Sequence, residues 1–128
     1  LTKENAHELI SRYDIVVDGM DNFMTRYIVS DECKLQGKPY VYGAIRGLDG
    51  QVAVLCKGHT TYRSLLPDEE ATLSMPHPGK AVLGTTPAVV GSVEACQVLM
   101  LAAEFGEPLI DRLWTVDLST MMSYVIEM

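Results

Sequence analysis

The stretch DIVVDGMDNFMTR, residues 14–26, joins a short apolar run to the start of a helix. Ile15, Val16 and Val17 do not alternate with polar residues, which is typical of a strand buried in a parallel sheet. The run ends at Asp18, and a helical pattern starts a few residues later. In open α/β sheets, ligands bind beyond the carboxyl ends of the strands. The stretch therefore predicts a strand–helix unit and the place to look for a binding site.

Segments of regular structure are predicted on both sides of this stretch. Hydrophobic periodicity and capping signals predict helices over residues 2–13, 22–36 and 87–105. Runs rich in β-branched residues predict strands over residues 14–18, 39–45, 50–55, 112–118 and 121–128. Thr2 and Thr86 are the expected caps of the first and last helices, and the last helix is apolar on most sides, which predicts burial. The fold class is therefore α/β, with a mixed sheet that begins parallel and turns antiparallel.

Residues 56–86 differ from the rest of the chain in composition. They contain several prolines and glycines and an acidic run at residues 68–70, and they are expected to form one long crossover loop. His59 and His77 lie in it and are expected to be solvent-exposed loop histidines rather than metal ligands.

Composition and charge limit the classes of function. The chain has 128 residues, the size of one domain, with 48% hydrophobic residues and a net charge of −7. No basic run is present, which argues against nucleic-acid binding. We expect no membrane segment, because no apolar run reaches roughly 18 residues. Three scattered cysteines and no signal peptide favour a cytoplasmic protein, and the absence of an initiator Met suggests a piece of a longer one.

Polar residues with a possible chemical role follow the first strand. Asp18, Asp21 and Asn22 occupy its carboxyl end, where the free N–H groups and dipole of the next helix favour a phosphate. A carboxylate beside a phosphate repels it unless a cation lies between them, so Asp21 is a candidate ligand of Mg²⁺ bound to a nucleotide. Arg26, one helical turn further on, could stabilise phosphate charge or orient Asp21.

A simpler interpretation is that Asp21 or Asn22 only caps the helix, which contributes about 1 kcal/mol. The spacing alone favours this simpler interpretation. No glycine-rich phosphate loop of either common pattern occurs anywhere in the chain.

A wider set of motifs resembles the ThiF/MoeB/HesA family, the bacterial relatives of ubiquitin-activating enzymes. The family pattern is an apolar strand, then D-x-x-D-N-x-x-x-R, then G-K-P-x-x-x-G-A and G-Q-V. The matching positions are Asp18, Asp21, Asn22, Arg26, Gly37 to Pro39, Gly43, Ala44 and Gly50 to Val52. Residues 81–117 resemble the later helix and closing strand of the family, so the similarity covers nearly the whole chain.

The resemblance implies an activity, cofactors and a partner. Family members use ATP and Mg²⁺ to adenylate the C-terminal Gly carboxylate of a small ubiquitin-like protein, often a sulfur carrier for molybdopterin or thiamine synthesis, and they are commonly homodimers. Asp21 then corresponds to the catalytic residue of the Mg²⁺–nucleotide site, with Arg26 supporting catalysis and Asp18 and Asn22 helping to bind the nucleotide. The resemblance thus favours a nucleotide–Mg²⁺ role for Asp21 over a cap.

The chain also departs from the family pattern. The ATP-binding glycine-rich half is absent, so residues 1–128 are expected to be a single partial adenylyltransferase domain, the C-terminal half of a Rossmann-like ubiquitin-activating fold, inactive alone. Thr61 and Ser64 stand where many members carry the first pair of zinc-binding cysteines, so no zinc is expected. The missing zinc cysteines, and the lack of any cysteine in residues 57–85 where some members carry one, leave open an alternative, a degenerate, non-catalytic member that acts as a binding or dimerisation module.

Overall fold

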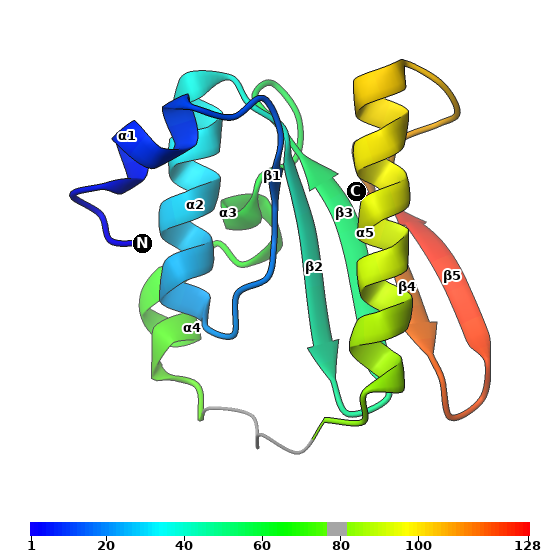
Figure 1. Cartoon of the computed structure of the whole chain (residues 1–128). Coiled ribbons are helices and arrows are strands. Elements are labelled where there is room, and N and C mark those ends of the chain that lie inside the picture. The colour runs from blue at the N-terminus through cyan, green and yellow to red at the C-terminus, as the bar shows by residue number, and fades with distance from the viewer. Residues whose placement is uncertain (77–81) are drawn as a thin grey trace.

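The protein is a five-stranded sheet with helices on both faces (Figure 1). The computed structural model describes residues 1–76 and 82–128. The strands are β1 (Val16–Val17), β2 (Tyr40–Arg46), β3 (Asp49–Leu55), β4 (Arg112–Asp117) and β5 (Met122–Glu127). The helices are α1 (Ala6–Ser11), α2 (Phe23–Gln36), α3 (Tyr62–Leu65), α4 (Glu69–Ser74) and α5 (Thr85–Ala103).

The sheet begins parallel and continues antiparallel, as the sequence predicts. Its strands lie in the order of the chain. β1 pairs in parallel with β2, with Val17 opposite Val41, and α2 makes the crossover between them. β2, β3, β4 and β5 then pair antiparallel in succession. The turn between β2 and β3 contains Gly47 at φ +59°, a conformation that glycine adopts without strain. The α/β fold class with a mixed sheet is therefore confirmed.

Alternate residues of the central strands face two separate cores. Tyr40 and Tyr42 of β2 pack with Tyr27 of α2 and with α1 and α3, on one face of the sheet. Val41 of β2 packs with Val90 of α5 on the other face. Because successive strand residues point to opposite faces, α2 and α5 lie on opposite sides of the sheet. Gly43 of β2 belongs to the α5 side, and this decides its neighbours.

The two helices nearest the first strand differ in how well the sequence predicts them. α2 begins after Asn22 and ends at Gly37, which takes the left-handed conformation with φ +67°, as expected of a helix C-terminus. The first helix is shorter than predicted, because residues before Asn5 form a turn and Thr2 is not its cap. Instead the backbone N–H of Thr2 donates to Asn5 Oδ1 (2.7 Å).

The segment 56–86 is not one long loop. Two short helices, α3 and α4, form within it, and α5 begins at its end. Each short helix has a polar residue before its first turn, Thr61 for α3 and Asp68 for α4. The Asp68 side chain accepts a hydrogen bond from the backbone of Ala71 (2.9 Å), which stabilises the start of α4. His77, expected to be an exposed loop residue, lies outside the described residues.

The prediction that the last helix is buried is wrong. Its sheet-facing side carries Val90, Glu94 and Gln97, whereas Leu99 on the outer side is 59% exposed. Thr86 lies inside the helix, not at its cap, and its hydroxyl donates to the carbonyl of Gly47 (2.7 Å). Periodicity cannot show which side of an all-apolar helix is covered.

The expectation that no segment could cross a membrane is too strict. Among the described residues, α5 is long and apolar enough to do so by length and composition. That is weak evidence, since a helix packed on a sheet passes the same test. α5 packs against β2 and β3, and three polar residues, Thr86, Glu94 and Gln97, are buried on it.

Candidate functional site

A buried ion pair lies at the carboxyl end of β1. Arg26 of α2 donates from Nε to Oδ2 of Asp18 (2.8 Å), and the side chains are 12% and 0% exposed. The second oxygen of Asp18 accepts the backbone N–H of Met20 (2.8 Å). Both oxygens of Asp18 therefore have partners within the chain, and its described contacts make it the residue that holds Arg26.

Two carbonyl groups complete the surroundings of Arg26. Nη2 donates to the carbonyl of Met20 (2.7 Å) and to that of Gly43 (3.2 Å). The guanidinium also lies over the ring of Tyr42, 5.7 Å from its centroid. Burial alone would lower the pKa of Arg26, but the charge and hydrogen bond of Asp18 outweigh that effect and raise it. Arg26 is therefore a fixed positive charge that links α2, the end of β1 and β2.

Asp21 and Asn22 lie beside this pair at the start of α2. Asn22 Oδ1 accepts the backbone N–H of Thr25 (2.8 Å), so Asn22 caps the helix and the capping interpretation holds for this residue. Its amide nitrogen donates to Oδ1 of Asp21 (3.0 Å). Asp21 itself is exposed. Capping therefore occupies Asn22 and leaves the Asp21 carboxylate at the surface.

The residues present fit a nucleotide-bound Mg²⁺ better than a site made of protein ligands alone. No group of three or more His, Cys, Asp or Glu side chains that could hold a metal occurs within residues 1–76 and 82–128. Mg²⁺ commonly takes one or two carboxylates and completes its shell with phosphate oxygens and water. One exposed carboxylate at a helix N-terminus, next to a fixed guanidinium, meets that requirement.

A groove of about 860 Å³ opens beside Arg26, on the α2 side of the sheet. Its lining includes Tyr42 of β2, Gln51 of β3 and Tyr124 of β5. Met75, just after α4, is among its other lining residues. The groove thus joins the exposed strands of the sheet to the guanidinium at the end of β1.

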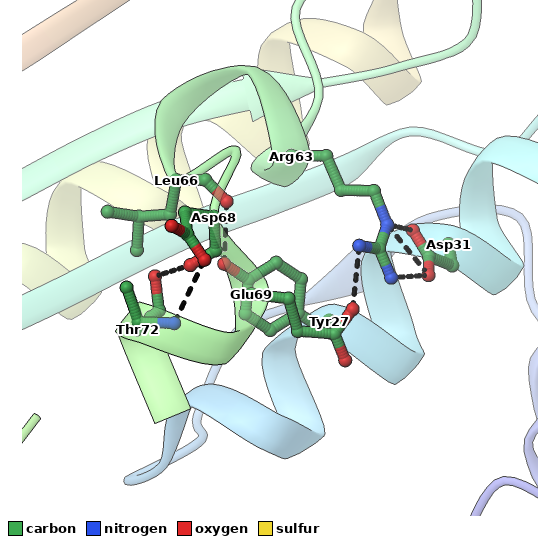
Figure 2. A network of polar contacts seen from close by, with 8 residues as sticks. Tyr27, Asp31, Arg63, Leu66, Asp68, Glu69 and Thr72 are labelled. Atoms are coloured by element: carbon green, nitrogen blue, oxygen red, sulfur yellow. Dashed lines mark hydrogen bonds and ion pairs between the residues drawn. The ribbon is translucent and has the colours of Figure 1, made fainter. Parts of the chain in front are cut away.

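Arg63 is one of the residues that connect helices α3 and α4 to α2 (Figure 2). Arg63 of α3 donates from Nε and Nη2 to Asp31 of α2, with the shortest distance 2.7 Å, and from Nη1 to Glu69 (2.7 Å). The guanidinium also lies 5.0 Å from the ring centroid of Tyr27. The hydroxyl of Tyr27 in turn donates to the carbonyl of Leu66 (2.6 Å). These contacts fix the segment that borders the groove.

Thr61 and Ser64, the positions compared with zinc ligands, interact with each other. Their hydroxyl oxygens lie 3.3 Å apart, and the backbone N–H of Thr61 donates to the Ser64 hydroxyl (3.1 Å). Nearby, Asp111 accepts from His59 (2.7 Å) and from Thr60. Hydroxyls and an imidazole–carboxylate pair thus connect this segment to the start of β4. The expected absence of zinc stays a prediction.

One buried acid at the site escapes sequence reasoning. Glu94 is 7% exposed, and its carboxyl group lies directly against Gly43 of β2. It is the single charged residue in the 19 residues of α5, and that isolation was the available signal. The structure thus brings Asp18, Arg26 and Glu94 to the same part of the sheet, with Asp21 and Asn22 adjoining.

The whole chain is similar to a known protein family. The family model described as ThiF family matches residues 1–128, the whole chain. The chain belongs to the ThiF family. The family resemblance read from the motifs is therefore confirmed.

ThiF-family relatives with named activities are similar over most of this chain. A sulfur carrier protein adenylyltransferase of Thermus thermophilus is 44% identical over 126 residues, covering 91% of this chain and 46% of that protein. The adenylyltransferase and sulfurtransferase MOCS3 of Arabidopsis thaliana is 41% identical, covering 98% of this chain and 28% of that protein. The SAMP-activating enzyme E1 of Haloferax volcanii is 38% identical, covering 93% of this chain and 44% of that protein. The chain thus spans less than half the length of these relatives.

Solved structures agree on the fold. The structure of E. coli MccB with ATP superimposes with a TM-score of 0.74 at 18% identity, covering 100% of this chain and 41% of that chain. The structure of E. coli MccB with MccA superimposes with a TM-score of 0.78 at 16% identity, covering 100% of this chain and 40% of that chain. At such identity the likeness concerns the fold alone.

Proposed function

We propose that this chain is the part of an ATP-dependent adenylyltransferase that carries the Mg²⁺-binding carboxylate and one wall of the substrate site. The observation that carries the proposal is the arrangement at the end of β1, where Arg26 is fixed by buried Asp18 while Asp21 stays exposed beside it. The activities named for relatives that are 38–44% identical support the same reaction.

The reaction adenylates a carboxylate at the α-phosphate of ATP and releases pyrophosphate. Magnesium, when bound, neutralises phosphate charge in such a reaction. Asp21 would hold it at the start of α2, where the helix dipole also favours the phosphates. Arg26 supplies a positive charge that needs no rearrangement, because Asp18 and two carbonyl groups already hold it.

The proposed substrate is the C-terminal glycine of a ubiquitin-like sulfur carrier. An extended, small-residue tail suits the groove beside Arg26, which is about 860 Å³ and is lined in part by β5. A tail lying there would bring its carboxylate to the guanidinium end of the groove. Because the family commonly forms homodimers, we also propose that the whole protein is a homodimer.

Carrier-dependent ATP–pyrophosphate exchange by the whole protein tests this function. Exchange should require a ubiquitin-like carrier with an intact Gly-Gly end, and the same carrier lacking its last glycine is the matched control. Equal exchange with the intact carrier and with the carrier lacking its last glycine would contradict the proposed substrate. No exchange with any intact carrier would favour a non-catalytic binding module.

We further propose that residues 1–128 alone bind ATP weakly or not at all, because the matched ThiF-family relatives are more than twice as long. Calorimetric titration of the isolated chain, with its helix content checked by circular dichroism, measures this directly. A micromolar dissociation constant would contradict it.

A further inference from the structure

Glu94 is a buried acid whose place in the fold is defined by a glycine. A methyl group added at Gly43 would overlap the Glu94 carboxyl group, and even the farther oxygen, Oε2, would lie 3.0 Å from the added carbon. Contact as close as this leaves no room for a side chain at position 43 while Glu94 keeps its conformation. The glycine in the G-A motif thus makes room for an acid from the opposite helix.

Gly43 connects Glu94 to Arg26. Its α-carbon faces the Glu94 carboxyl group, and its carbonyl oxygen accepts a hydrogen bond from Arg26 Nη2 (3.2 Å). Arg26 is bonded on its other side to Asp18. A single residue of β2 therefore separates a buried acid from the fixed guanidinium of the site.

The groups around Glu94 act on its charge in opposite directions. The pKa of Glu94 is raised to about 7, first by burial and then by the charge of Asp18, while the charge of Arg26 acts to lower it. Among the described residues, the side chains of β2 and β3 on the same face are apolar, including Val41, Val52 and Val54. Glu94 therefore faces two charged groups, one from the end of β1 and one from α2.

A buried oxygen of Glu94 without a hydrogen-bond partner in the described part of the chain favours the neutral form of its carboxyl group. Oε1 is buried and has no hydrogen-bond partner among the described residues. A buried carboxylate needs donors for its oxygens, whereas a protonated carboxyl group loses less by burial. The ligand-free site is therefore suited to an uncharged Glu94.

We propose that Glu94 is a positioning residue for Arg26 that acts in its protonated form, so that loss of its proton weakens the binding of an anion at Arg26. This inference rests on the proposed function, which places the phosphates of ATP there. With Glu94 neutral, Asp18 and Arg26 balance each other. With Glu94 ionised, the cluster carries a net negative charge and Arg26 has a second counter-ion that competes with the phosphate.

Linkage adds a consequence that requires no substitution. If the proton on Glu94 favours anion binding, then anion binding must favour the proton to the same extent. The protein should therefore take up protons when it binds ATP slightly above pH 7. Calorimetry in two buffers of different ionisation enthalpy measures this uptake, after correction for the protons of ATP itself. Zero uptake, or net release, would overturn the proposal.

A pair of variants of the whole protein gives the second test. Between pH 6.5 and 8.5 the dissociation constant for ATP–Mg²⁺ should rise about fivefold or more in the unaltered protein. Glu94→Gln keeps the shape without the charge and should lose this rise. Glu70→Gln removes an exposed carboxylate of α4 and should keep it. An unchanged pH profile in Glu94→Gln would overturn the proposal.

Failure here can be distinguished from failure of the proposed function. Infrared spectra of the ligand-free protein should show a protonated-carboxyl band that disappears as pH rises through 7 and is absent in Glu94→Gln. Carrier-dependent exchange with an identical pH profile in both proteins overturns the role of Glu94 alone. If the affinity for ATP depends on the protonation of Glu94 but no carrier-dependent exchange is found, the role of Glu94 is supported and the proposed function is rejected.

Discussion

Two arginine–carboxylate pairs each link separate elements of this protein, and they differ most in burial. Arg63 and Asp31 form more hydrogen bonds than Arg26 and Asp18, at similar distances. Yet the Arg63 pair is 42% and 45% exposed, whereas the Arg26 pair is 12% and 0% exposed. Hydrogen bonds to Asp31 and Glu69 raise the pKa of Arg63, but water can replace them.

The number of hydrogen bonds therefore does not indicate which arginine contributes more to stability. Removing one member of a buried pair leaves the other charge without water or partner. Removing one member of an exposed pair leaves it hydrated. Substitutions of Asp18 or Arg26 should therefore cause large losses of stability. Substitutions in the Arg63 contacts of α3 and α4 should cause small ones. The effects of substitutions should follow this order.

The largest loss of stability is expected from Arg26→Met. It leaves the Asp18 carboxylate buried and unpaired, so the free energy of unfolding should fall by about 3–5 kcal/mol in urea denaturation. Asp18→Asn combined with Arg26→Met should recover part of that loss, because no charge is then left alone. A loss below about 1 kcal/mol for the single variant would contradict the burial argument.

Glu94 should make the stability of the folded chain depend on pH. Its pKa rises from 4.5 to about 7 on folding, so between these values the folded chain keeps a proton that the unfolded chain has lost. Stability should therefore fall as pH rises from 4.5 to 7, by on the order of 3 kcal/mol for this group. Unfolding of Glu94→Gln across this range should lack that fall. A parallel fall in both proteins would contradict the assignment.

Loss of the helix cap should have a smaller effect. Asn22→Ala removes the bond to the backbone of Thr25, and the free energy of unfolding should fall by about 1 kcal/mol. Asn22→Ser, which can still cap, should retain most of the stability. Equal losses in the two variants would show that Asn22 matters for something other than capping.

The smallest effect on global stability is expected from Arg63→Ala. The free energy of unfolding should fall by less than about 1 kcal/mol, and by less still at high ionic strength. Amide hydrogen exchange in α3 and α4 should nevertheless become faster, since the ion pairs of Arg63 with Asp31 and Glu69 are lost. A loss comparable to that of Arg26→Met would remove the distinction between the two regions.

The sequence predicts the first region better than the second. The run from Asp18 to Arg26 is local, so strand, cap and helix can be read from consecutive residues. The β2–β3 hairpin is predicted for the same reason. By contrast, Arg63 reaches Asp31 across 32 residues, and no local pattern links them.

Other features were missed for identifiable physical reasons. The capping residues Thr61 and Asp68 are a signal for α3 and α4. The prolines and glycines around them are equally typical of a loop, so the local pattern does not reveal these short helices. The exposed side of α5 could not be found, because apolar residues surround that helix. Glu94 stood out only by its charge, and its contact with Gly43 required the packing of α5 on β2.

The exposed Asp21 carboxylate beside the buried pair is proposed to serve catalysis. Carrier-dependent ATP–pyrophosphate exchange by Asp21→Ala, made in the whole protein, tests that role. Asp31→Ala removes a carboxylate of the same helix, one that faces Arg63, and is the matched control. The Asp21 variant should lose exchange by a factor on the order of 100 or more while staying folded. The Asp31 variant should keep most of it, and unchanged exchange in Asp21→Ala would contradict the claim.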